Sequence, residues 1–144
     1  MIYSIESPDK IDAKESDYLY IKESQIPDAG NGLFTSILIY KNEIISVFKG
    51  EILSVEEAEI RTKNRMDRYF INMLDGTIMD SMKVKCFAKY ANDSEGLVKT
   101  NFKINSTITL DDDNNVCLVA IRDVNIEEEI FCSYGNKYWR KFIK

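Results

Sequence analysis

The chain has 144 residues, 44% of them hydrophobic, which is enough for one globular domain with a buried core. It contains no histidine, so serine or cysteine nucleophiles activated by histidine and His-containing zinc sites are excluded. The formal net charge of -5 argues against broad binding to nucleic acid phosphates and suits a basic peptide as partner.

Neither a metal cluster nor a membrane segment is indicated by the sequence. The cysteines at 86, 117 and 132 are widely spaced and form no CxxC pair, so no disulfide framework or thiolate cluster is expected. The N-terminus lacks the apolar run of a signal peptide, and no apolar stretch of about 18 residues occurs. We therefore expect no metal, no membrane association and an intracellular location, in cytoplasm or nucleus.

Short β-prone runs bounded by turn residues recur along the chain and predict strands. These runs occupy residues 18–21, 37–39, 44–48, 68–74, 77–80, 108–110, 116–121 and 130–134. Residues 1–17 are polar and show little periodicity, so we expect a flexible leader there. Asp75-Gly76 between two of the runs predicts a tight hairpin.

One helix is predicted with a defined start. Ser54 is followed three residues later by Glu57, a capping box that opens a helix ending near Asn64. Residues from Trp139 onward are expected to form a short helix or tail. Because strands dominate and do not alternate with helices, the sequence predicts a mainly β domain.

Several polar segments admit an ordinary structural explanation when each is taken alone. Residues 30–32 combine two glycines and an asparagine, which permit close approach of a ligand but are also usual turn residues. Asparagine and aspartate at 92–93 favour a turn, and the tyrosine within 133–135 favours packing. The three glutamates at 127–129 are expected to form a solvated turn.

A calcium loop is suggested at one place and then rejected. Asp111, Asp113 and Asn115 match the first three ligand positions of such a loop. Val116 and Arg122 stand where the loop requires glycine and a bidentate glutamate. A polar hairpin tip is therefore favoured.

Taken in chain order, these segments resemble the SET domain of protein lysine methyltransferases over residues 18–139. Residues 27–34 are similar to the opening GxG segment of the family, and 89–94 to its Arg-Phe-Ile-Asn-His-Ser motif. The other similar segments are 41–45, 48–51, 78–80, 120–124, 128–130 and 133–135. The resemblance implies small curled β-sheets, a C-terminal pseudoknot and a few short helices, with residues 1–17 as leader and 140–144 as a short tail.

The resemblance also implies a site for S-adenosylmethionine and a lysine channel. Tyr134 takes the position of the catalytic tyrosine of the family, and Tyr69 that of a second one. The implied cofactor-binding residues are Gly30, Asn31, Gly32, Leu33, Tyr90, Asn92, Asp93 and Trp139. Cys132 and Tyr138 are implied for the substrate channel. Asp93 stands where the family has histidine, so we expect its backbone to contact the cofactor and its carboxylate to attract the substrate or the ammonium group of the cofactor.

Methyl transfer to lysine suits a chain without histidine, because in-line displacement depends on positioning more than on a strong base. An apolar channel would lower the pKa of the substrate amine. Cys132 is smaller than the aromatic residue common two positions before the tyrosine, so we expect methylation beyond one methyl group. Cysteine-rich flanking segments are missing, so residues 136–144 or a second subunit, as in a homodimer, would complete the channel.

Two alternatives remain at the level of sequence. Lys89, Asp93 and Glu127 depart from the family motifs, as in a SET-like module that binds a peptide without catalysis. Retention of the glycine loop, Asn92 and Tyr134 favours the enzyme. A structural β-domain unrelated to the family would require coincidental matches. The expected substrate is a protein or peptide with an accessible lysine, and histones are one candidate.

Overall fold

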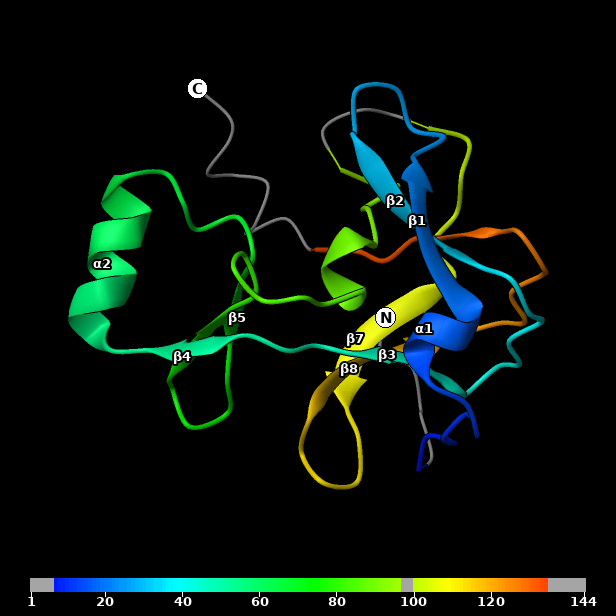
Figure 1. The fold of residues 1–144 in the computed structure, drawn as a ribbon, viewed down its shortest axis with the longest axis horizontal. Coiled ribbons are helices and arrows are strands. Elements are labelled where there is room, and N and C mark those ends of the chain that lie inside the picture. Colours follow the sequence, from blue (N-terminus) through cyan, green and yellow to red (C-terminus); the bar gives the residue numbers. More distant parts are fainter. Residues whose placement is uncertain (1–6, 97–99, 135–144) are drawn as a thin grey trace.

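The computed structural model describes residues 7–96 and 100–134, and within them three small antiparallel sheets form the fold (Figure 1). The first sheet has the order β1 (Leu19–Glu23), β2 (Asn31–Thr35), β9 (Glu129–Ile130). The second has the order β3 (Ile44–Val47), β8 (Val116–Ala120), β7 (Ser106–Leu110). The third has the order β4 (Glu51–Leu53), β6 (Ile78–Asp80), β5 (Phe70–Asn72). The predicted mainly β class is confirmed.

The described helices are short. They are α1 (Glu15–Tyr18), α2 (Val55–Lys63) and the 3-10 turn η1 (Ala88–Tyr90). The predicted capping box is confirmed, because Ser54 is the N-cap of α2 and the Glu57 N–H donates to its Oγ at 3.1 Å. No helix among the described residues has the length and apolar character needed to span a membrane.

Both predicted hairpins are confirmed. β5 pairs with β6 across the Asp75-Gly76 turn, and β7 pairs with β8 across residues 111–115. The run at 37–39 is not a strand, because only Ile39 forms a bridge there. The last strand also ends at Ile130, earlier than predicted, because the following residues leave the sheet edge.

The segment before β1 is attached to the domain from Asp9 onward. The Asp9 N–H donates to the carbonyl of Asn42 at 2.9 Å, and the Ile44 N–H donates to that of Asp9 at 2.8 Å. The Glu15 carboxylate accepts bonds from the Ser46 hydroxyl and the Val47 N–H. Residues 9–17 therefore do not form the flexible leader expected from their polarity, and the ordered domain begins before Tyr18.

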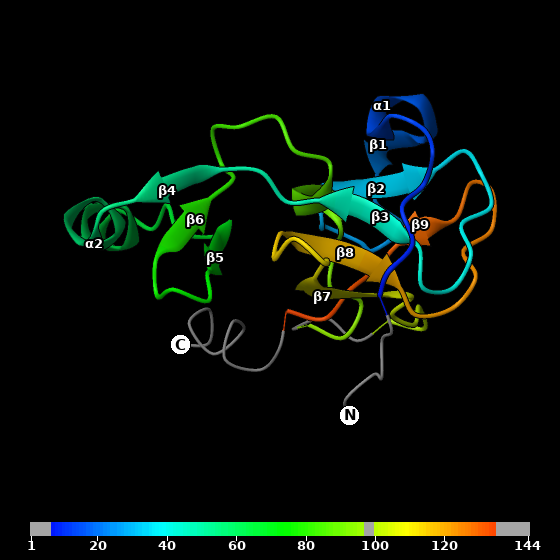
Figure 2. The same cartoon turned by 90° about the horizontal axis from the view of Figure 1, so that it is seen from below.

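The molecule divides into two regions. One region, here called the α2 lobe, comprises residues 51–80 with α2 and the β4–β6–β5 sheet, and it lies at one end in Figure 1. The other, here called the sheet core, comprises the two remaining sheets with η1, and Figure 2 shows the same division from below. The main hydrophobic cluster lies in the sheet core, with Leu33, Ile45 and Leu118 fully buried. Asn42 has φ 75°, a left-handed conformation that asparagine tolerates.

Candidate functional site

Residues 131–134, which follow β9, run beside the segment around Asn92. Asn92 and Phe131 form a parallel bridge, and the Cys132 N–H donates to the Asn92 carbonyl at 2.9 Å. Two residues that are far apart in the sequence, Asn92 and Tyr134, are thereby fixed on neighbouring stretches of backbone.

On its other side, the segment after β9 is held by Asn105 and Ser106, where β7 begins. The Phe131 carbonyl accepts bonds from the N–H groups of Asn105 and Ser106 at 3.0 and 3.1 Å. The side chain of Asn105, which is fully buried, accepts the Phe131 N–H at 2.8 Å and donates to the Glu129 carbonyl at 2.8 Å. The segment therefore lies between two loops with its backbone groups paired on both sides, and its position is tightly determined.

Tyr134 is oriented by the segment that it crosses. Its hydroxyl donates a short hydrogen bond to the Ala91 carbonyl, and its N–H donates to Asp93 Oδ2 at 2.8 Å. Asp93 is 8% exposed, and its Oδ1 accepts the Glu95 N–H at 2.8 Å. The Asp93 carboxylate therefore faces the backbone of Tyr134, and the expectation that it attracts the substrate or the cofactor stays a prediction.

Asn92 links this crossing to the glycine loop. Its Nδ2 donates to the Asn31 carbonyl at 3.0 Å and lies 3.4 Å from Glu129 Oε2. A Cβ on Gly32 would lie 2.3 Å from Glu129 Oε2, so this position has no room for a side chain. Gly30 has φ 71°, and no atom of the described residues lies within 4 Å of the place of a Cβ there. The predicted residue Leu33 contributes through its core position, since its side chain is fully buried.

Glu129 is a structural centre that the sequence interpretation missed. Its side chain is fully buried and accepts bonds from the Ser24 hydroxyl at 2.7 Å and the Gln25 N–H at 2.8 Å. The expectation of a solvated turn at 127–129 is therefore wrong for Glu129. The apolar run that begins at Ile130 was the available signal, because an acidic residue adjoining such a run enters the interior with it.

The two tyrosines predicted as catalytic line one cavity. It measures about 170 Å³, and its apolar walls include Phe48, Phe70 and Ile108 together with Tyr69 and Tyr134. Tyr69 immediately precedes β5 in the α2 lobe, whereas Tyr134 follows β9 of the sheet core. The cavity therefore lies where the two regions meet, a suitable place for an extended side chain to enter.

The other predicted site residues lie elsewhere. Cys132 is 1% exposed and belongs to the core cluster, and burial raises the pKa of its thiol. It is not among the described residues that line the cavity, in contrast to its expected place in the channel. Tyr90 packs against the core cluster, with its ring centroid 5.4 Å from Lys89 Nζ. Tyr138 and Trp139 lie outside the described residues.

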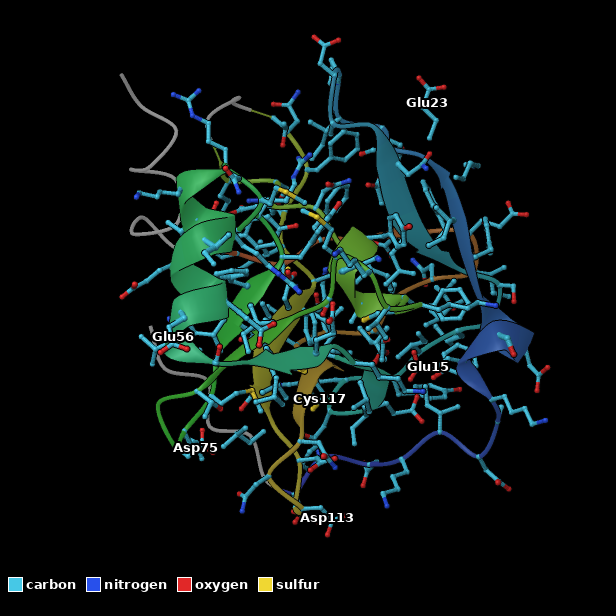
Figure 3. All side chains as sticks on the ribbon, turned by 60° about the vertical axis from the view of Figure 1, so that its left-hand side comes forward. Glu15, Glu23, Glu56, Asp75, Asp113 and Cys117 are labelled. Atoms are coloured by element: carbon cyan, nitrogen blue, oxygen red, sulfur yellow. The ribbon has the colours of Figure 1, made fainter. Side chains whose placement is uncertain are left out.

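The acidic loop at 111–115 is a hairpin tip, as the sequence indicated. Asp111 Oδ1 accepts the N–H groups of Asp113 and Asn115 at 2.9 and 2.8 Å, which fixes the turn. Figure 3 shows Asp113 at the end of the β7–β8 hairpin, pointing away from the body of the protein. Among the described residues, no group of three or more potential ligands is placed to hold a metal ion.

Comparison with protein families identifies the fold. The family model described as SET domain matches residues 30–135. The chain belongs to the SET-domain family. The predicted family and its fold of small β-sheets are confirmed, and the match spans both the glycine loop and Tyr134. The family consists in general of protein lysine methyltransferases, which typically bind S-adenosylmethionine. No curated protein matches the chain.

Proposed function

We propose that this SET-domain protein transfers methyl groups from S-adenosylmethionine to the side-chain amine of lysine in a protein or peptide. The observation that carries the proposal is the juxtaposition of Tyr134 and Tyr69 in one cavity, with Asn92 joining the adjacent crossing to the glycine loop. Positioning of this kind is what an in-line displacement requires.

The residues around the glycine loop fit a polar cofactor. Ser94 Oγ is buried and has no hydrogen-bond partner among the described residues, so it is available to a ligand. In the antiparallel β1–β2 pair, successive residues of β2 direct their N–H and C=O groups alternately toward β1 and away from it. The Asn31 carbonyl faces away from β1 and accepts a bond from Asn92. Around Gly30, no atom of the described residues lies within 4 Å of the place of a Cβ. When bound there, S-adenosylmethionine would supply an activated methyl group on a sulfonium centre.

Tyr134 would hold the substrate amine in line with the methyl group. Its hydroxyl donates to the Ala91 carbonyl, and a hydroxyl oxygen that donates can also accept a hydrogen bond, here from the substrate amine. Tyr69, Phe48 and Phe70 would enclose the aliphatic part of the lysine and exclude water. This arrangement binds and orients the amine without a general base of its own.

The proposed substrate is a flexible, lysine-containing protein segment. The chain carries a formal net charge of -5, which favours encounter with basic segments by long-range attraction. Histone tails are one candidate of this chemistry. Methylation beyond one methyl group is part of the proposal. It rests on the cavity that Tyr134 lines, because Cys132 lies in the core and is not among the described lining residues.

The test combines cofactor binding with methyl transfer. Purified protein is incubated with S-adenosylmethionine labelled in its methyl group, together with core histones or a pool of lysine-containing peptides. We expect transfer to lysine, and we expect Tyr134→Phe to lower the rate by about 100-fold with little change in cofactor affinity. Tyr40→Phe is the control, because Tyr40 is 57% exposed and should tolerate the change.

Calorimetry separates the possible results. Absence of cofactor binding would contradict the proposed enzyme. Cofactor binding without transfer to any peptide would favour the non-catalytic, partner-binding module. Mass spectrometry of the product under exhaustive conditions gives the number of methyl groups, and monomethyllysine alone would contradict the proposal of higher methylation.

A further inference from the structure

Lys89 is a fixed positive charge at the edge of the cavity. Its Nζ donates to the carbonyls of Ser81, Met82 and Val84 at 3.0, 3.3 and 3.0 Å. An ammonium group has three N–H donors, and here all three are used. The group is thereby held in place, while neutral carbonyls leave its net charge intact.

This charge adjoins the side chains that would receive a substrate. Lys89 lines the same cavity as Tyr69 and Tyr134, and its Nζ lies 5.6 Å from the centroid of the Tyr69 ring. The guanidinium carbon of Arg68, another lining residue, also lies 5.6 Å from that centroid. No carboxylate occurs among the described residues that line the cavity, so its charged groups are cationic.

Asp80 adjoins the lining residue Ser81, and Asp93 is bonded to the lining residue Tyr134; both carboxylates are engaged elsewhere. Asp67, next to the lining residue Arg68, is not in the described lining and has an interaction of its own. Asp80 is fully buried, with its Oδ2 2.7 Å from Arg61 Nη1 and its Oδ1 accepting the Met82 N–H at 3.0 Å. Asp93 accepts the N–H groups of Tyr134 and Glu95. None of these carboxylates belongs to the described cavity lining, whose charged residues are Lys89 and Arg68.

We propose that Lys89, with support from Arg68, is a specificity-determining residue that makes the cavity select the neutral amine over the ammonium form of the substrate lysine. This inference rests on the proposed methyl transfer. A like charge nearby disfavours a second cation, so it should lower the pKa of the bound substrate amine.

The proton and electrons balance without any further reactant. The substrate ammonium releases its proton to water before or during entry, and the neutral nitrogen keeps a lone pair. That pair forms the bond to the methyl carbon, while the electrons of the breaking carbon–sulfur bond stay on sulfur. The product is a methylated ammonium, which the same cationic lining disfavours, so the charge also assists product release.

The test is the pH dependence of the methylation rate at saturating lysine peptide, measured from pH 7 to 10 with labelled S-adenosylmethionine. The rate at saturation reports the ionisation of the substrate amine in the bound complex. In a plot of this rate against pH, Lys89→Met should therefore move the rising limb to higher pH by about one unit. Its rate should be about tenfold lower at pH 7, and the deficit should narrow toward pH 10. Lys89→Arg, which keeps the charge, should follow the wild type.

Controls separate charge from structure. Lys83→Met removes an exposed lysine of the same loop and should leave the profile unchanged. Arg68→Met removes an exposed cation and should shift the limb in the same direction as Lys89→Met but by less, which keeps the test valid if loss of Lys89 impairs folding. Cofactor affinity by calorimetry should not change in either variant.

Three results would overturn the inference. An unshifted limb in both Lys89→Met and Arg68→Met would show that the charge has no role. A rate in Lys89→Met that falls by the same factor at every pH would show a purely structural role. If wild-type protein transfers no methyl group to any peptide, the proposed function fails and this inference falls with it, whereas an active wild type with unshifted variants contradicts the inference alone.

Discussion

The α2 lobe and the sheet core are built by different means. In the lobe, the helix buries only Ala58 among its described side chains, and Val55 and Ile60 are 74% and 58% exposed. The sheet core instead joins residues a hundred positions apart, such as Ser24 and Glu129, through buried hydrogen bonds. The lobe is held by local turns, a helix cap and the ion pair between Arg61 and Asp80, which lie 19 positions apart. The core is held by polar contacts between residues that lie about a hundred positions apart. Substituting residues of the same type in the two regions should therefore change the free energy of unfolding by different amounts.

The largest expected difference in stability comes from two glutamates. Glu129→Ala should lower the free energy of unfolding by about 3 kcal/mol, because the Gln25 N–H and the Ser24 hydroxyl lose their buried acceptor. Glu56→Ala on the exposed face of α2 should change it by less than about 0.5 kcal/mol. Urea denaturation of both variants measures this difference. Equal effects would show that the Glu129 network contributes little.

The sheet core should also respond to alkaline pH. Burial, with the Asp111 carboxylate adding to it, raises the pKa of the Cys117 thiol from 9.0 to about 11. Because the folded pKa is the higher one, this stabilisation is complete below about pH 9 and is lost as pH rises through about 11. The loss is on the order of 2 kcal/mol.

Urea denaturation at pH 8 and pH 10.5 checks this prediction. The wild type should lose stability between the two values, and Cys117→Ala should lose less. Tyr18 contributes in the same direction, since burial raises the pKa of its hydroxyl, so part of the loss should persist in the variant. Identical losses in both proteins would contradict the assignment to Cys117.

The smallest expected effect lies in the lobe. Ser54→Ala removes the acceptor of the Glu57 N–H and should lower the free energy of unfolding by about 1 kcal/mol. Val55→Thr at the next, exposed position should change it by less than about 0.5 kcal/mol. Hydrogen exchange should place the Ser54 effect within α2. Faster exchange throughout the sheet core would show that the two regions are coupled more strongly than their contacts indicate.

Features that depend on nearby residues were predictable. The α2 cap follows from Ser54 and Glu57, the β5–β6 turn from Asp75-Gly76, and the left-handed residue from Asn42. In each case a side chain or a backbone preference acts within a few residues, so sequence order preserves the cause.

The roles of polar residues at the site were not predictable in the same way. Glu129 looked like one of three solvated glutamates, and Asp93 like a group facing a ligand. The partners of Glu129, Ser24 and Gln25, lie 105 and 104 positions away in the sequence, and the Tyr134 N–H lies 41 positions from Asp93. Nothing in local pattern specifies which distant donor a carboxylate meets.

The sequence by itself determined a mainly β domain, its hairpins, its helix cap and, through ordered motifs, its family. The tertiary structure alone decided that Tyr69 and Tyr134 share a cavity, that Asp93 supports the tyrosine backbone, and that Lys89 is fixed in the lining of that cavity. The physical reason is that backbone preference acts over a few residues, whereas burial, charge and hydrogen bonding depend on which distant segments meet.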